Sequence, residues 1–118
     1  MSEISKLDGQ LNEMILSGRA LEGFEKFYSE DCVMQENTEP PTVGKDANRQ
    51  REIEFFDSLA EFHGGEVLST AAGDGVTFSE WVFDVTFKNG RRKKLEQAVV
   101  RRWRGGRIYS ERFYYNAD

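Results

Sequence analysis

The sequence predicts a cone-shaped α+β domain in which a curved antiparallel sheet wraps around three N-terminal helices. Three turn signals in the second half of the chain indicate the sheet: Asp74-Gly75, Asn89-Gly90 and Gly105-Gly106. Each separates segments rich in β-branched and aromatic residues, and Asn-Gly and Asp-Gly readily adopt the positive φ values of tight hairpin turns. The first half carries helical patterns instead. The 118 residues are enough for one domain, residues 1–118, with a core that needs no disulfide.

Apolar residues at helical spacing predict three helices in the first half of the chain. The first covers residues 3–17, and a short second helix with one apolar face follows it and ends before Ser29. The third helix runs from about Lys45 to Phe62 and is stopped by Gly64-Gly65. Its predicted buried face consists of Ile53, Phe56, Leu59 and Phe62.

One short strand and a four-stranded meander are expected to form the sheet. The short strand is Cys32–Gln35, and residues 37–43 after it should form a loop, because proline fits neither a helix interior nor a central strand. The meander strands are predicted near residues 65–72, 76–88, 92–103 and 107–115. Both faces of the 76–88 strand are partly apolar, which indicates that one packs on the helices and the other on a second copy of the chain. We therefore expect a homodimer joined through the outer face of the sheet.

The net charge argues against nucleic acid as a partner. The formal net charge is −5, although nine of the sixteen cations lie in residues 88–107. A basic hairpin of this kind could contact phosphates. The alternative is a solvated face or strand edge, which we favour because there is no motif for base readout.

Cys32 is the only cysteine, so no internal disulfide can form and a reducing, cytoplasmic setting is expected. The residue itself should be a small buried core residue. The N-terminal sequence lacks the pattern of a signal peptide, and no apolar run approaches the roughly 20 residues that span a bilayer, so no membrane partner is expected. His63, the only histidine, is expected to cap the third helix. One His and one Cys make no catalytic pair or dense metal-ligand set, and no metal or cofactor is implied.

The order of these elements resembles the nuclear-transport-factor-two-like superfamily. The resemblance rests on a short helix ending in Phe27-Tyr28-Ser29-Glu30-Asp31, a loop with prolines and Gly44, and a meander ending in Gly106-Arg107-Ile108 and Phe113-Tyr114-Tyr115. Within this superfamily the chain is similar to the SnoaL-like branch, which includes polyketide cyclases and ketosteroid isomerases. The resemblance implies a pocket for a small apolar molecule inside the cone. It leaves function open, since one scaffold of this kind carries enzymes, binding modules and transport factors.

The resemblance also implies a candidate general base. In ketosteroid isomerases the base is a carboxylate at the end of the short strand that follows a Tyr-x-x-Asp turn, and Glu36 aligns with that position. A carboxylate at a pocket mouth beside Val33 and Met34 could have its pKa raised toward neutrality and act as a base. The alternative is a solvated loop acid beside Glu39.

The oxyanion hole of those isomerases is not matched. They donate hydrogen bonds from a tyrosine on the first helix and from a protonated aspartic acid on the sheet. Leu11 falls at the tyrosine position and Val99 at the acid position. Neither side chain can donate, so steroid isomerisation by that mechanism is not expected.

The last strand supplies a second group of candidates. Tyr109, Glu111, Phe113 and Tyr115 alternate on one face. The resemblance points this face into the pocket, with Tyr115 at the position of a pocket tryptophan. Glu111 would then be a second interior carboxylate and would need a partner, because an unpaired buried charge is costly. A structural ion pair on the sheet surface is the alternative.

The partner of Glu111 depends on the turn at Gly105-Gly106. A three-residue turn that includes Arg104 puts Gln97, Val99 and Arg101 on the face of Glu111. A two-residue turn puts Glu96, Ala98 and Val100 there instead.

Three functions remain open on this basis. The first is an isomerase-like or cyclase-like enzyme, a lyase or hydrolase with a carboxylate base, that uses Glu36 and Glu111 as catalytic acids or bases. In it the ligand would be contacted by Gln97, Arg101, Phe113 and Tyr115. The second is a non-catalytic ligand-binding module. The third is a dimerisation or protein-interaction module that uses the outer face of the sheet.

Overall fold

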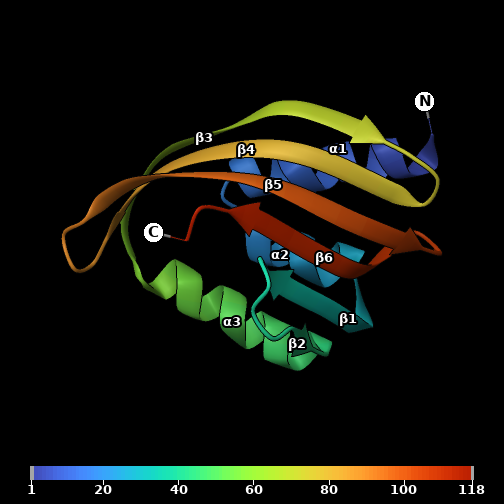
Figure 1. The fold of residues 1–118 in the computed structure, drawn as a ribbon, viewed down its shortest axis with the longest axis horizontal. Helices are drawn as coiled ribbons and strands as arrows, with labels where there is room; N and C mark the ends of the chain where they lie inside the picture. The colour runs from blue at the N-terminus through green and yellow to red at the C-terminus, as the bar shows by residue number, and fades with distance from the viewer. Residues whose placement is uncertain (1, 118) are drawn as a thin grey trace.

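The computed structural model describes residues 2–117 and shows a curved, unclosed sheet of six strands with three helices (Figure 1). This architecture confirms the predicted α+β cone. Helices and strands follow in the order α1 (Glu3–Leu16), α2 (Ala20–Phe27), β1 (Tyr28–Glu36), β2 (Thr42–Val43), α3 (Lys45–Asp57), β3 (Leu59–Ala72), β4 (Val76–Phe87), β5 (Arg92–Arg104) and β6 (Arg107–Tyr115). No helix among these residues is long and apolar enough to cross a membrane.

The sheet has the strand order β2-β1-β6-β5-β4-β3. Strands β3 to β6 form the predicted antiparallel meander. The first long strand, β1, pairs in parallel with the last one, β6, and this pairing sets Met34 opposite Glu111 and Glu36 opposite Phe113. The candidate residues near position 36 and those of the last strand are therefore neighbours, although more than seventy residues separate them in the chain.

The first strand is longer than predicted, and the predicted loop holds a strand of its own. Strand β1 extends to both sides of Cys32–Gln35, and the two-residue strand β2 pairs with it antiparallel, Val33 opposite Val43. The prolines precede β2 directly, where no hydrogen bond from a proline nitrogen is needed. The turn into this segment uses Asn37 at a positive φ of 50°, which asparagine tolerates.

The predicted third helix is too long, and its predicted buried face is wrong. Helix α3 ends at Asp57, where Ser58 caps it with a hydrogen bond from its backbone N–H to the carbonyl of Glu54. Phe62 belongs to β3, opposite Val85, and Phe56 and Phe62 are 36% and 49% exposed. The register of β3 shifts near both Ala60 and His63, and such bulges give a strand an apolar spacing that resembles a helix.

His63 consequently lies in a strand and does not cap a helix. Its Nε2 atom is 2.7 Å from the hydroxyl oxygen of Thr86 on the neighbouring strand. The sequence prediction failed because a single residue before a Gly-Gly pair fits the end of a helix and the middle of a bent strand equally well.

The turn between β5 and β6 combines the two registers that the sequence left open. Gly105 and Gly106, both at positive φ, form a two-residue turn that pairs Arg104 with Arg107. Tyr109 is then an extra residue in β6, and beyond this bulge the pairing is shifted by one position. As a result Arg101 lies opposite Glu111, as expected of the longer turn. The bulge, not the turn, decides that Glu111 of β6 shares the inner face with Arg101.

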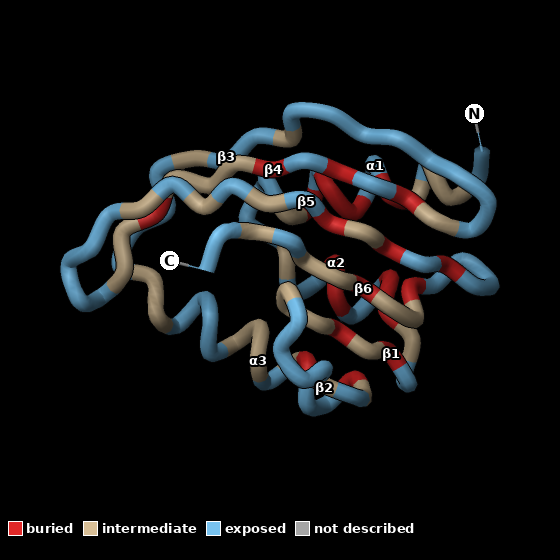
Figure 2. Tube along the Cα trace, in the orientation of Figure 1, coloured by how far each residue is buried: buried red, intermediate tan, exposed pale blue. Residues whose placement is uncertain are grey.

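The apolar core lies between α1, α2 and the neighbouring strands. Buried positions in Figure 2 concentrate there, whereas β3 and the tip of the β4–β5 hairpin are exposed. Cys32 is fully buried, as expected, and both tryptophans are buried. The cluster consists of Leu11, Met14, Phe24, Phe27, Tyr28, Cys32, Met34, Trp103 and Ile108.

Candidate functional site

A buried arginine joins three elements in the interior. The side chain of Arg101 on β5 donates from Nε to Glu111 Oε2 on β6 at 2.7 Å. Its Nη1 atom donates to Asp8 Oδ1 at 2.8 Å and to Asn12 Oδ1 at 2.6 Å, both on α1. Arg101 and Glu111 are each only 2% exposed. A buried charge is tolerated only where it is paired and hydrogen-bonded, so this arrangement fixes α1 against the sheet.

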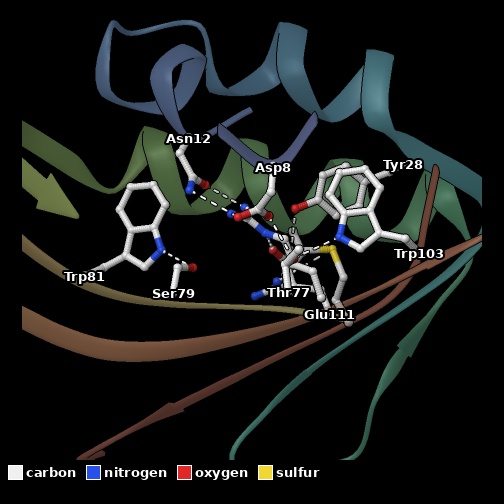
Figure 3. Close-up of polar contacts among 11 residues, drawn as sticks. Asp8, Asn12, Tyr28, Thr77, Ser79, Trp81, Trp103 and Glu111 are labelled. Atoms are coloured by element: carbon white, nitrogen blue, oxygen red, sulfur yellow. Dashed lines mark hydrogen bonds and ion pairs between the residues drawn. The ribbon is translucent and has the colours of Figure 1, made fainter. Parts of the chain in front are cut away.

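Further donors complete this network, as Figure 3 shows. The Tyr28 hydroxyl donates to Glu111 Oε1 at 2.6 Å, and the Thr77 hydroxyl donates to Asp8 Oδ1 at 2.9 Å. The indole of Trp103 donates in turn to the Thr77 oxygen at 2.9 Å. Burial, with the charge of Glu111, raises the pKa of Tyr28 well above its ordinary value, so this hydroxyl stays protonated and remains a donor.

Glu111 thus finds the partner that the sequence suggested, Arg101, and not the other candidate, Gln97. Gln97 lies farther along β5, opposite Tyr115. Both oxygens of Glu111 are hydrogen-bonded to protein groups, and the side chain is inaccessible. This geometry favours a structural role for Glu111 and Arg101.

A second polar cluster forms around Glu36 at the end of β1. Its Oε2 atom accepts a hydrogen bond from Nη1 of Arg51 on α3 at 2.7 Å, and its Oε1 atom accepts one from the hydroxyl of Tyr115 on β6. The Arg51 guanidinium also lies over the ring of Phe113, 5.7 Å from its centroid. The structure therefore brings together three predicted residues, Glu36, Phe113 and Tyr115, around an arginine that the sequence analysis missed.

The Glu36 cluster borders a hollow of about 310 Å³. Burial and the hydrogen bond to Glu36 raise the pKa of Tyr115 to about 12, so its hydroxyl is a donor at neutral pH. The Glu36 carboxylate is held at this hollow by a guanidinium and a phenol. The hollow is lined by Met34, Glu36, Glu39, Pro40, Thr42, Arg51 and Tyr115.

Glu52, next to Arg51 on α3, is the interior carboxylate that the sequence analysis missed. It is only partly exposed, and no described residue donates a hydrogen bond to it. Burial raises its pKa to about 7, the charges of Glu111 and Glu36 add to this rise, and Arg51 and Arg101 oppose it. It lies four residues after the buried Asn48 on the same helix, and no motif in the sequence marks it.

The two positions that would form an oxyanion hole in the isomerases are apolar and inside the core. Leu11 and Val99 are each 1% exposed. Neither side chain offers a hydrogen-bond donor. Among residues 2–117, no group of three or more His, Cys, Asp and Glu side chains is arranged to hold a metal ion.

A family model described as a SnoaL-like domain matches residues 10–111 of this chain. A solved structure from Mesorhizobium loti, a candidate SnoaL-like polyketide cyclase, is 28% identical and superposes with a TM-score of 0.84 over 98% of this chain and 100% of that one. No curated protein sequence gives a significant match.

Two more distant structures share the fold. An NTF2-like protein from Burkholderia pseudomallei is 17% identical, with a TM-score of 0.85 over 98% of this chain and 92% of that one. AclR from Streptomyces galilaeus, a candidate hydroxylase, is 14% identical, with a TM-score of 0.81 over 98% and 90% of the two chains. At these identities the likeness is one of fold.

The buried network predicts a large difference between two arginines of β5. Replacing Arg101 by Met leaves Asp8 and Glu111 buried without their cation and should lower the free energy of unfolding by about 3–5 kcal/mol. Arg92 makes a similar two-nitrogen contact with Asp84, but at the surface, and Arg92→Met should change stability little. Urea unfolding of both variants checks this. If both variants lost the same free energy of unfolding, the interior ion pairs would not be what stabilises the fold.

The pKa of Glu52 predicts a pH-dependent stability. The unfolded chain releases this proton near the ordinary value of 4.5 and the folded chain near 7, so the folded state loses stability as the pH rises between these values. At about 1.4 kcal/mol per unit, the loss reaches at most about 3.5 kcal/mol above pH 7. Glu52→Gln should therefore have a higher free energy of unfolding than wild type at pH 8. This difference should become small at pH 5.

Glu54→Gln is the matched control for this measurement, because Glu54 is exposed on the same helix. Urea unfolding of the three proteins at several pH values gives the comparison. A constant gap between wild type and Glu52→Gln from pH 5 to 8 would contradict the assignment.

Proposed function

Because this chain belongs to the SnoaL-like domain family, we propose that it binds a small, mainly apolar molecule at the hollow beside Glu36 and transfers protons on it by general acid/base catalysis. The observation that carries the proposal is the pairing of two unlike carboxylates around Arg51. Glu36 is held by the guanidinium and by Tyr115 at the wall of the hollow. Glu52 follows Arg51 on α3 and has no hydrogen-bonding partner among the described residues.

Of the two carboxylates, Glu52 has the pKa suited to proton transfer, although it is Glu36 and not Glu52 that lines the hollow. A general acid or base is most effective when its pKa lies near the working pH, and that of Glu52 is about 7. Glu36 keeps free lone pairs on both oxygens and orients a hydroxyl or N–H of the ligand. The reaction class is removal of a proton next to a carbonyl and its return elsewhere, or closure of a ring through the same carbanion. No cofactor is required for this chemistry.

The runner-up is a ligand-binding module without turnover, in which the same hollow holds the molecule and Glu52 only tunes stability. Proton exchange separates the two functions. In deuterated water, a catalyst that removes protons next to a carbonyl exchanges them for deuterium even when no net reaction follows, and a binding module does not.

We expect wild type to accelerate deuterium incorporation into at least one cyclic ketone of a small panel, followed by proton NMR. Glu52→Gln should slow this exchange by about 10²–10⁴-fold, the usual contribution of a positioned acid or base. Glu36→Gln should raise the ketone concentration needed for half-maximal rate. Glu54→Gln again serves as the control. Ketone binding without exchange would favour the binding module, and equal rates for wild type and Glu52→Gln would remove Glu52 from the mechanism.

We also propose a homodimer through the outer face of the sheet. This face carries a hollow of about 170 Å³ and exposed apolar side chains, including Phe78 and Tyr114. Two arginines, Arg102 and Arg112, border the hollow. The same face also carries two glutamates outside the hollow, Glu80 on β4 and Glu96 on β5. A surface with opposite charges on its two sides complements itself across a two-fold axis.

Light scattering at micromolar concentration should give twice the mass of the chain. Arg102→Glu places like charges across the proposed interface and should shift the protein to monomer, and adding Glu96→Arg to that variant should restore the dimer. A monomeric wild type would overturn the proposal. A dimer that ignores both substitutions would move the interface to another surface.

A further inference from the structure

We propose that Arg51 is the oxyanion donor of this site and that the substrate is a neutral carbonyl compound whose oxygen lies on the Nε–Nη2 edge of its guanidinium. This inference rests on the proposed function and adds the group that would stabilise the negative charge developing on the carbonyl oxygen. The positions that supply such donors in the isomerases are Leu11 and Val99 here and cannot do so.

The first argument is that one edge of the Arg51 guanidinium, formed by Nε and Nη2, has no oxygen acceptor among the described residues. Arg51 uses Nη1 for Glu36, whereas its Nε is buried without a hydrogen-bond partner among the described residues. Its Nη2 contacts only the sulfur of Met34, at 4.0 Å. An unmade hydrogen bond of a buried charged donor is costly, so such a group calls for an explanation.

Four arginines that are paired through Nε make the contrast clear. Arg49, two residues earlier on α3, gives Nε and Nη2 to the two oxygens of Glu25. Arg92 does the same with Asp84. The Nε of Arg101 is taken by Glu111, and that of Arg112 by the carbonyl of Asn37. The Nε–Nη2 fork is the edge that binds an oxygen acceptor well, and only in Arg51 among these five is it left without one.

The second argument is the location of the edge. Arg51 and Met34 both line the hollow of about 310 Å³. A methionine side chain is flexible, and its sulfur is a weak acceptor that a ligand oxygen readily replaces. The guanidinium itself is held in place by the Glu36 ion pair and by the Phe113 ring, so it is already oriented before a ligand arrives.

The third argument concerns charge and decides the substrate class. Burial and the charges of Glu111 and Glu36 raise the pKa of Glu52, and the charges of Arg51 and Arg101 lower it. Burial also raises the pKa of Tyr28, and the charge of Glu52 adds to this rise. Both guanidiniums in this set already carry a carboxylate partner. A substrate carboxylate would add a further negative charge beside Glu36 and Glu52, whereas a neutral carbonyl enters without that cost. As Glu52 takes the proton from the neighbouring carbon, the C–H electron pair moves onto the carbonyl oxygen, and Arg51 then faces the resulting enolate.

A phenol is the probe for this edge, because its planar anion resembles an enolate, and 4-nitrophenol reports its own ionisation by visible absorbance. Wild type should take it up as the neutral phenol and pass its proton to Glu52, so that the bound phenolate absorbs visible light. The Arg51 Nε–H proton signal should then shift downfield in ¹⁵N-edited NMR. Arg51→Lys keeps a cation for Glu36 but has no Nε. It should lose the phenolate absorbance and slow ketone exchange by about 10²-fold, the usual effect of losing one oxyanion donor.

Arg49→Lys is the matched control, since the fork of Arg49 is already filled by Glu25, and it should behave as wild type. The inference is overturned if Arg51→Lys retains both the phenolate absorbance and the exchange rate while Glu52→Gln still abolishes exchange. That result would leave the proposed function standing with another donor. If wild type neither binds the phenolate nor exchanges any ketone, the proposed function fails together with the inference.

Discussion

The buried ion pair between Arg101 and Glu111 is the constraint on which the arrangement of this interior depends. Two neighbouring strands can present these side chains on one face only if β6 contains the extra residue Tyr109. The same guanidinium reaches Asp8 and Asn12 and so fixes the rotation of α1 on the sheet. Charges removed from water tolerate few alternative geometries, and we therefore regard this network as the element that specifies one packing of the helix against the strands.

Three glutamates of the interior illustrate how environment assigns different tasks to one side chain. Glu111 is fully hydrogen-bonded and inaccessible, Glu36 is held by two donors at the wall of a hollow, and Glu52 has no hydrogen-bonding partner among the described residues. The first arrangement supports the fold, the second positions a charge, and the third leaves a proton that moves near neutral pH. Pairs of titratable groups with separated pKa values are the usual basis of acid/base chemistry.

Helix α3 matters more to the site than its short length suggests. It provides Arg51 and Glu52 from adjacent positions. The Arg51 side chain contacts Glu36 on β1, and the pKa of Glu52 is shifted by burial and by the charges of the interior. The helix has to end at Asp57, because the chain then continues into β3, which follows the bent edge of the sheet. The fold is shared with proteins described as cyclases and as a hydroxylase, and for this reason function here is argued from these side chains and not from the scaffold.

Local sequence determined the parts of this protein that depend on a few neighbouring residues. Turn dipeptides marked the hairpins, apolar spacing marked α1 and α2, and the order of elements was enough to indicate the family. It also singled out Glu36, Tyr115 and the Arg101–Glu111 pair as candidates. Tertiary structure alone decided the bulge at Tyr109, the end of α3, and the roles of Arg51 and Glu52. The reason is physical: turn and helix preferences act over a few residues, whereas strand register, ion pairing and the pKa of a carboxylate depend on groups that are distant in the chain and meet only when it folds.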